Sequence, residues 1–279
     1  TIILLVYAYV ASVLPVTTLL QPRDFINAYQ LIIAMALLTA GVLFSAFSGT
    51  LTIVAPAFQA APEAAPPLWP FLFITIACGA ISGFHSLVSS GTSAKQVRSE
   101  SDSLFVGYGS MLVEGGLATL VIIAVSAGIG MGYTSGSGEY LTGISAWTNH
   151  YASWAAAAGL GSKIKAFVDG AANMIAMTGL PRGIAAVVMG VFVASFAGTT
   201  LDTATRIQRY IVTELFTTVK LRTFGNRYVA TGFAVSTAAL LAFASGADGK
   251  GALSLWPLFG AVNQTLAALA LIQHTLYLK

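Results

Sequence analysis

Seven stretches of roughly 20 mostly apolar residues run through this chain, and each is long enough to cross a bilayer as a helix. Transmembrane β-strands would instead give short segments of alternating polarity. Charged residues make up only 8% of the 279 residues, whereas a soluble domain carries roughly 25%. We therefore predict an all-α, polytopic transmembrane helical bundle with spans at about residues 1–20, 26–47, 69–90, 104–129, 182–204, 227–245 and 254–277.

The basic residues between these stretches predict the orientation of the chain. By the positive-inside rule, the larger set lies in the cytoplasm, and it comprises Arg23, Lys95, Arg98, Arg206, Arg209, Lys220, Arg222, Arg227 and Lys279. The smaller set, with Thr1, then lies outside, and it comprises Lys163, Lys165, Arg182 and Lys250. The alternation agrees with seven spans, which indicates a multi-pass protein.

We treat residues 1–279 as a single transmembrane domain. Its first and last residues adjoin apolar stretches, and it lacks an initiator Met, so we expect a fragment of a longer chain. The stretch 131–180 would be an external loop, either a lid or an ordinary surface segment. Trp147 and Trp154 favour an interfacial or re-entrant helix at about Ile144–Ala158, because tryptophan prefers the headgroup level.

The run WPFLFITIACGAISGFHSLVSSG begins as a good membrane span but then becomes polar and glycine-rich. A loosened helix at membrane depth must face protein or a water-filled cavity, and discontinuous helices form the binding sites of many secondary transporters. A simpler alternative is close helix packing, with the histidine satisfied by a neighbouring helix. We predict that the substrate path is lined by Ser82, Gly83, His85, Ser86 and Ser89.

A second polar segment is GTTLDTATR, which carries a carboxylate among hydroxyl groups. Helical spacing places Thr199, Asp202 and Arg206 on one face. We predict an ion-coupling site at Thr199, Thr200, Asp202 and Thr203, either for Na⁺ or for a proton. The alternative is a modest Asp202–Arg206 ion pair at a helix end.

For the other polar residues in or beside the predicted spans, a structural role is an alternative to a functional one or is sufficient by itself. Glu114 is a further candidate for proton coupling or a structural partner, because a carboxylate inside a span must be paired or protonated. Asn263 and Gln264 are expected to hydrogen-bond a neighbouring helix. In the tract LQPRDF, Pro22 would end one helix and Asp24 would cap the next.

Several function classes lack support in the sequence. Cys78 is the single cysteine, so neither an internal disulfide nor a thiolate metal cage is possible. No nucleotide-binding loop, zinc-protease motif or hydrolase elbow occurs, and the basic residues form no nucleic-acid footprint. We expect no enzyme and no cofactor beyond a coupling ion. The rival interpretations are a redox subunit with haem bound by His85 and His274, and a passive channel or structural subunit of a membrane complex.

Five strings together resemble the carbon starvation protein A family of transporters, and they cover almost the whole chain: ASVLPVTTLLQPRDFINAY, PFLFITIACGAISGFHSLVSSGTSAKQV, GYGSMLVEGGLA, AGTTLDTATRIQRYI and LWPLFGAVNQTLAALAL. The family is similar to the amino acid–polyamine–organocation superfamily, whose fold has two inverted five-helix repeats with broken first and sixth helices. The resemblance implies that His85 lies in a broken helix and that Thr199, Thr200 and Asp202 lie near a cation site. It also implies further N-terminal spans.

These observations together predict a secondary transporter of the bacterial cytoplasmic membrane. The resemblance implies uptake of peptides or pyruvate during carbon starvation, so we expect import of a pyruvate-like carboxylate or short peptides. The driving ion would be H⁺ or Na⁺, and the partners would be the small-molecule substrate and the lipid bilayer. The sequence leaves the oligomeric state open.

Overall fold

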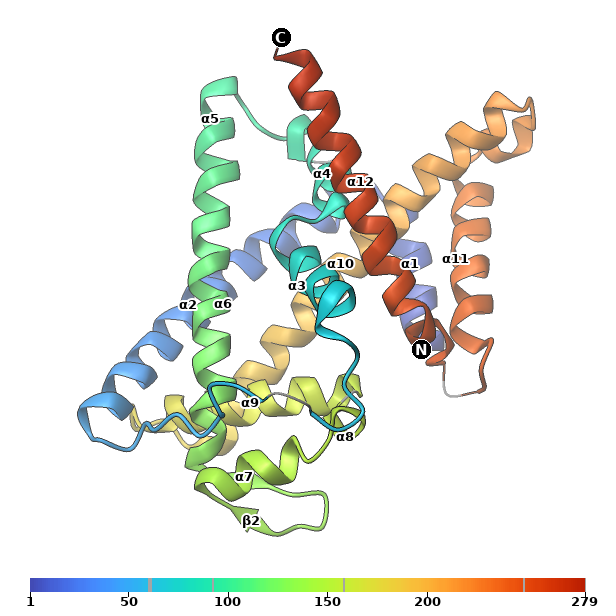
Figure 1. Ribbon diagram of the computed structural model, residues 1–279. Coiled ribbons are helices and arrows are strands. Elements are labelled where there is room, and N and C mark those ends of the chain that lie inside the picture. Colours follow the sequence, from blue (N-terminus) through green and yellow to red (C-terminus); the bar gives the residue numbers. More distant parts are fainter. Residues whose placement is uncertain (60–61, 92, 158, 248, 279) are drawn as a thin grey trace. The chain divides into compact units, whose positions relative to one another are not determined.

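The structure is a computed structural model that describes residues 1–59, 62–91, 93–157, 159–247 and 249–278. Helices make up most of it, and the described ranges contain one short pair of strands (Figure 1). The prediction of a helical protein is confirmed. Lys279 and the side chains of Cys78 and Arg222, which entered the sequence predictions, lie outside the described residues.

Three helices in the described ranges are long and apolar enough to cross a membrane: α2 (Leu20–Phe47), Glu100–Met131 and α10 (Arg182–Thr218). The second of these runs through four consecutive elements, namely α5 (Glu100–Leu104), η3 (Phe105–Gly109), α6 (Ser110–Ser126) and η4 (Gly128–Met131). These helices coincide with three of the predicted spans, so the chain is a membrane protein. The count of seven spans and the inverted-repeat fold stay predictions.

The first predicted span is a shorter helix than the sequence indicated. Helix α1 (Ile2–Val13) stops before residue 20, where the predicted span ends. It ends at Val13 because Leu14 precedes Pro15 and is extended, with φ −68° and ψ 152°. The second apolar helix of this kind is α11 (Arg227–Phe243).

The predicted role of Pro22 as a helix end is wrong. Helix α2 already begins at Leu20, so Pro22 and Asp24 lie near its N-terminus. Proline is tolerated in the first turn because the N–H groups there have no intrahelical acceptor to lose. The connection from α1 is therefore the short segment 14–19.

The chain divides into two compact units, and α2, α5 and α10 each contribute to both. The first unit comprises Thr1–Arg23, Pro66–Ser103 and Gly198–Lys279. Within it, α1 packs against α11, and both helices carry buried alanines, among them Ala11 and Ala234. Its remaining elements are η1 (Leu68–Leu72), α3 (Phe73–Ala80), α4 (Gly83–Gly91), η2 (Ser93–Lys95), η5 (Arg222–Gly225), η6 (Gly251–Leu255) and α12 (Trp256–Tyr277).

The second unit comprises Asp24–Ala65 and Leu104–Ala197. Here the stretch 131–180, predicted as a loop, has its own secondary structure. It holds β1 (Tyr133–Thr134), β2 (Tyr140–Leu141), α7 (Gly143–His150), α8 (Trp154–Ala157) and α9 (Leu160–Ala176). The two strands are antiparallel, with Tyr133 opposite Leu141. Whether this stretch acts as a lid, and whether the whole chain is one transmembrane domain, stay predictions.

The core of the second unit joins α9 to the long helices around it. Leu38, Met174, Ile175 and Met189 are all buried in it. The backbones of α9 and the α6–η4 helix also approach closely, because a Cβ on Gly128 would lie 2.6 Å from the carbonyl oxygen of Gly170. Small residues at helix contacts allow such an approach.

We expect Gly170→Ala to destabilise this unit, because its added Cβ would overlap the carbonyl oxygen of Ala124. Overpacking typically costs about 1–3 kcal/mol, more than the gain of about 0.5–1 kcal/mol from replacing a helical glycine. Gly161→Ala is the control, since it lies on the same helix with no described atom within 4 Å of the new Cβ. Thermal unfolding in detergent should show a lower midpoint for Gly170→Ala alone. Equal midpoints would contradict the packing argument.

Candidate functional site

The glycine- and serine-rich run does form an interrupted helix. Helix α3 ends at Ala80 and α4 begins at Gly83, so Ile81 and Ser82 lie outside both (Figure 1). The interruption predicted from the sequence is therefore present. It frees backbone groups that need hydrogen-bond partners if the segment lies at membrane depth.

Helix α12 supplies these partners. The side chain of Asn263 accepts a hydrogen bond from the backbone N–H of Phe84 at 2.6 Å and donates one to the Ser82 hydroxyl at 2.9 Å. Gln264 donates to the carbonyl oxygen of Ile81 at 3.2 Å. The prediction that Asn263 and Gln264 bond a neighbouring helix is confirmed.

Gly83 lies directly against the same helix. A Cβ at this position would overlap the Asn263 carbonyl oxygen and lie 2.6 Å from the Ala267 nitrogen. Glycine is thus required here for the close approach of α4 and α12. This contact fits the packing alternative for Gly83, and its place in the substrate path stays a prediction.

The other residues of the predicted substrate path differ in their surroundings. His85 and Ser89 are exposed, and Ser86 is half-buried. The hydroxyl groups of Ser86 and Ser89 donate within α4, to the carbonyl oxygens of Gly83 at 2.6 Å and Ser86 at 3.0 Å. Their lone pairs stay available as acceptors, and the exposed His85 imidazole can donate to an anionic ligand.

Asp202 on α10 is completely buried and forms an ion pair with Arg23. The hydroxyl of Tyr7 donates to the same carboxylate oxygen at 2.9 Å, and it accepts a hydrogen bond from Arg23 at 3.0 Å. The second oxygen, Oδ1, is buried with no hydrogen-bond partner among the residues described. The three side chains form a closed triad with one unoccupied acceptor.

Arg206 does not form the predicted alternative pair with Asp202. Its guanidinium donates instead to the carbonyl oxygens of Ala11 at 2.8 Å and Leu14 at 2.9 Å. Arg209 donates likewise to the Ser12 carbonyl oxygen at 2.9 Å. The last carbonyls of a helix lack intrahelical donors, and cations are favourable at this end of its dipole. The two arginines thus cap α1.

The other predicted coupling residues differ in their exposure, and their role at the ion site stays a prediction. Thr199 and Thr203 are half-buried, and Thr200 is exposed. Glu114 is exposed on α6 and belongs to the other compact unit. Within the described part of the chain, no group of three or more His, Cys, Asp or Glu side chains is arranged to hold a metal ion.

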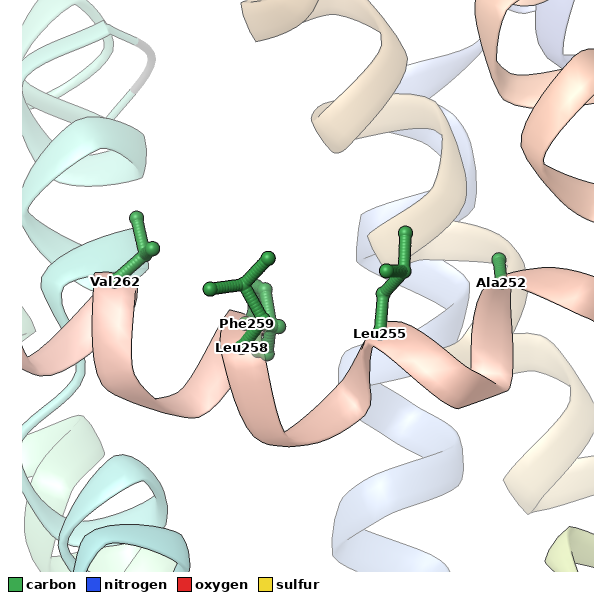
Figure 2. A pocket seen from close by; sticks show the side chains of 5 residues that line it. All are labelled: Ala252, Leu255, Leu258, Phe259 and Val262. Atoms are coloured by element: carbon green, nitrogen blue, oxygen red, sulfur yellow. The ribbon is translucent and has the colours of Figure 1, made fainter.

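A cavity of about 450 Å³ lies along the start of α12. Figure 2 shows the side chains that line it, and all of them are apolar: Ala252, Leu255, Leu258, Phe259 and Val262. These side chains offer no hydrogen-bond donor to a carboxylate, so this cavity does not meet the chemistry expected of the substrate site. His274, near the other end of α12, is exposed.

A polar cluster that the sequence interpretation missed surrounds His150 in the second unit. The buried imidazole lies 3.0 Å from the Tyr133 hydroxyl through Nδ1. The ammonium of Lys165 lies 4.3 Å from the centre of the Tyr133 ring and pairs with Asp169. Burial, and then the positive charge of Lys165, hold the pKa of His150 below its ordinary value of 6.5, while Asp169 opposes the shift.

These features define the class of the protein. It is a helical membrane protein with an interrupted helix and with an ion pair between helices that contains a buried carboxylate. The family model described as Carbon starvation protein CstA matches residues 1–279, so the chain belongs to that family.

Three relatives illustrate the match. The peptide transporter CstA of Helicobacter pylori is 32% identical, and the alignment covers 98% of this chain and 44% of the relative. The peptide transporter CstA of Bacillus subtilis is 33% identical, with 96% and 46% covered. The pyruvate/proton symporter BtsT of Escherichia coli is 31% identical, with 100% and 46% covered. The chain thus spans about half the length of these relatives. No solved structure matches it.

We expect Asn263→Ala to destabilise the interrupted helix, because the Phe84 N–H would lose its acceptor. An unsatisfied buried donor costs about 1–3 kcal/mol. Thr265→Ala is the matched control, since this exposed hydroxyl bonds only within α12. Hydrogen exchange should accelerate at residues 83–85 in the first variant and not in the second. Unchanged exchange in Asn263→Ala would contradict the bracing role of the amide.

The lowered pKa of His150 predicts a stability that depends on pH. Between its folded and unfolded pKa values the unfolded state binds more protons, so stability rises with pH and is fully present above about 6.5. Amides of α7 should therefore have lower protection factors, which correct exchange rates for their intrinsic dependence on pH, at about pH 5.5 than at about pH 7.5. His150→Gln should reduce this difference, whereas His274→Gln, on an exposed histidine, should keep it. A difference unaffected by His150→Gln would rule out this imidazole as the cause.

Proposed function

We propose that this protein is a proton-coupled secondary transporter of the bacterial cytoplasmic membrane, and that it imports a small carboxylate such as pyruvate or a short peptide. The names of its relatives support transport, and they divide between peptides and pyruvate at similar identity. Both substrates carry a carboxylate. The proposal therefore requires a site at which the protein can bind one carboxylate together with one proton.

The observation that carries the proposal is the triad that the buried Asp202 forms with the half-buried Arg23 and Tyr7. A buried charge without a partner costs several kcal/mol, so each change at this pair must conserve its neutrality. If a proton binds Asp202, the charge that holds Arg23 disappears. A substrate carboxylate can then take the place of Asp202 beside the guanidinium. One proton and one carboxylate enter together, and the site stays neutral.

A proton suits this site better than sodium. The Asp202 carboxylate already has a cationic partner, so Na⁺ would have to compete with Arg23, whereas a proton can bind the unpartnered Oδ1 oxygen. Water beside the protonated carboxyl group would then be bound by the hydroxyl groups of Thr199, Thr200 and Thr203. Glu114 remains a second candidate for proton transfer.

The interrupted α3–α4 helix supplies the path along which the substrate would travel. His85 can donate to an anionic group, and the carbonyl oxygens of Ser82 and Ser86 lie on the same segment. Asn263 and Gln264 hydrogen-bond to the residues at the interruption and hold the helix break in one position.

The test is uptake by the full-length protein in proteoliposomes. Labelled pyruvate and labelled dialanine are compared under an imposed pH gradient and under an imposed sodium gradient. We expect the pH gradient to drive uptake of one of them, with saturation and with exchange against unlabelled substrate. Uptake driven by sodium alone would overturn the proton proposal. Flux without saturation or exchange would indicate a channel.

We expect Asp202→Asn to lower uptake driven by the pH gradient by about tenfold or more, because the amide cannot exchange a proton and leaves Arg23 without its counter-charge. Exchange of labelled for unlabelled substrate, which moves no net proton, should be reduced less. Glu214→Gln is the matched control, since Glu214 is an exposed acid on the same helix. Normal coupled uptake in Asp202→Asn would remove this residue from the mechanism.

A further inference from the structure

The second unit contains a cavity that the transport mechanism does not use. It has a volume of about 300 Å³, and the polar and aromatic side chains that line it include Gln59, Trp147, Tyr151, Ser153, Trp154 and Lys163. All of these lie within Asp24–Ala65 or Leu104–Ala197, so the cavity belongs to this unit alone. Its size is at the lower end of ligand-binding pockets, which hold about 300–1,000 Å³.

The aromatic walls of the cavity are held by specific contacts. The rings of Trp147 and Tyr151 lie 4.3 Å apart between centroids, and the Tyr151 ring also contacts the buried imidazole of His150 at 4.5 Å. On another wall, the backbone N–H of Trp154 donates to the carbonyl oxygen of Glu63 at 3.0 Å, which ties α8 to the segment before α3. Rigid aromatic surfaces are suited to apolar or aromatic side chains of a ligand.

One positive charge at this cavity has no acidic partner among the residues that the structure describes. Lys163 makes no ion pair within the described ranges, although Lys165, two residues further along α9, pairs with Asp169. The amide of Gln59 is exposed and makes no hydrogen bond to the residues described. A cation and an amide beside aromatic walls fit a carboxylate attached to an apolar body.

We propose that this cavity is a second ligand site, distinct from the residues of α4 and α10, and that it binds the C-terminal carboxylate and last apolar side chain of a short peptide. The ammonium of Lys163 pairs with the carboxylate, and Gln59 donates to it. Trp147, Tyr151 and Trp154 enclose the side chain. A three-carbon acid lacks the apolar body that these rings would cover. The ligand class agrees with the proposed function, but binding here does not depend on proton coupling.

The experiment measures binding of alanylphenylalanine to the full-length protein in detergent by its intrinsic tryptophan fluorescence. We expect a saturable change for the wild type and a much smaller one for Trp154→Phe. Trp69→Phe, in the other unit, should keep the change. The same dipeptide with a C-terminal amide, and pyruvate, should both bind at least about tenfold more weakly, because the first lacks the charge-assisted bond and the second lacks the apolar body.

Lys163→Met tests the cation directly. It keeps the length of the side chain but should weaken binding of the dipeptide by about tenfold, whereas Lys220→Met, on an exposed lysine of the first unit, should bind as the wild type does. An unchanged melting temperature of Lys163→Met would show that the effect is not unfolding. Equal binding by Lys163→Met and wild type, or equal binding of the acid and the amide, would overturn the proposal.

A last comparison separates this site from the transport mechanism. Asp202→Asn should still give the fluorescence change with the dipeptide, even where its coupled uptake is lost. If wild-type protein binds the dipeptide at Lys163 but shows no gradient-driven uptake, the function proposed above fails and the cavity stands. If uptake is normal and the fluorescence is unchanged by the dipeptide, the cavity proposal fails alone.

Discussion

Backbone carbonyl and N–H groups that helices leave unpaired are the constraint on which the first unit depends. Lipid offers no hydrogen bonds, so each free group at membrane depth needs a partner from the protein. The chain meets this need with cations at the end of α1, where Arg206 and Arg209 cap three carbonyls. It meets the same need with neutral amides at the α3–α4 interruption, where Asn263 and Gln264 bond both flanks.

Arginines and neutral amides both satisfy free backbone groups, but they differ in the charge that they add to the surroundings. An amide satisfies the interruption without adding charge, so Asn263 and Gln264 leave the net charge around the helix break unchanged. Two guanidinium groups on α10 add positive charge, and a third arginine, Arg23, comes from the start of α2. Asp202 is the carboxylate that offsets this charge inside the cluster. Its protonation state therefore changes the electrostatic balance of the whole α1–α10 contact.

The sequence predicts those features that depend on residues close along the chain. Apolar length predicted the long helices, and the polar interruption after Ala80 predicted the helix break. Asn263 was correctly identified because an amide inside a span has few uses other than bonding a neighbour. The partner of Asp202 was missed because Tyr7 lies 195 positions away, and Arg23 was counted only as a topology signal. Arg23 and Arg206 were both placed on the cytoplasmic side, and this indicated that Arg23 could lie close to the charged residues of α10. The His150 cluster left no such signal, since its members alternate with apolar residues in a segment interpreted as a loop.

The arrangement of charged side chains on α10 gives the proposed coupling a structural route. Asp202, Arg206 and Arg209 are spaced by four and then three residues, so they share one helical face, and that face contacts Tyr7 and the end of α1. A change at Asp202 therefore acts on the same element that the two arginines hold. Coupling requires an element with two discrete arrangements that both ligands bias. Helix α1, whose C-terminal end is held by side chains of α10, is the element that we propose to have them.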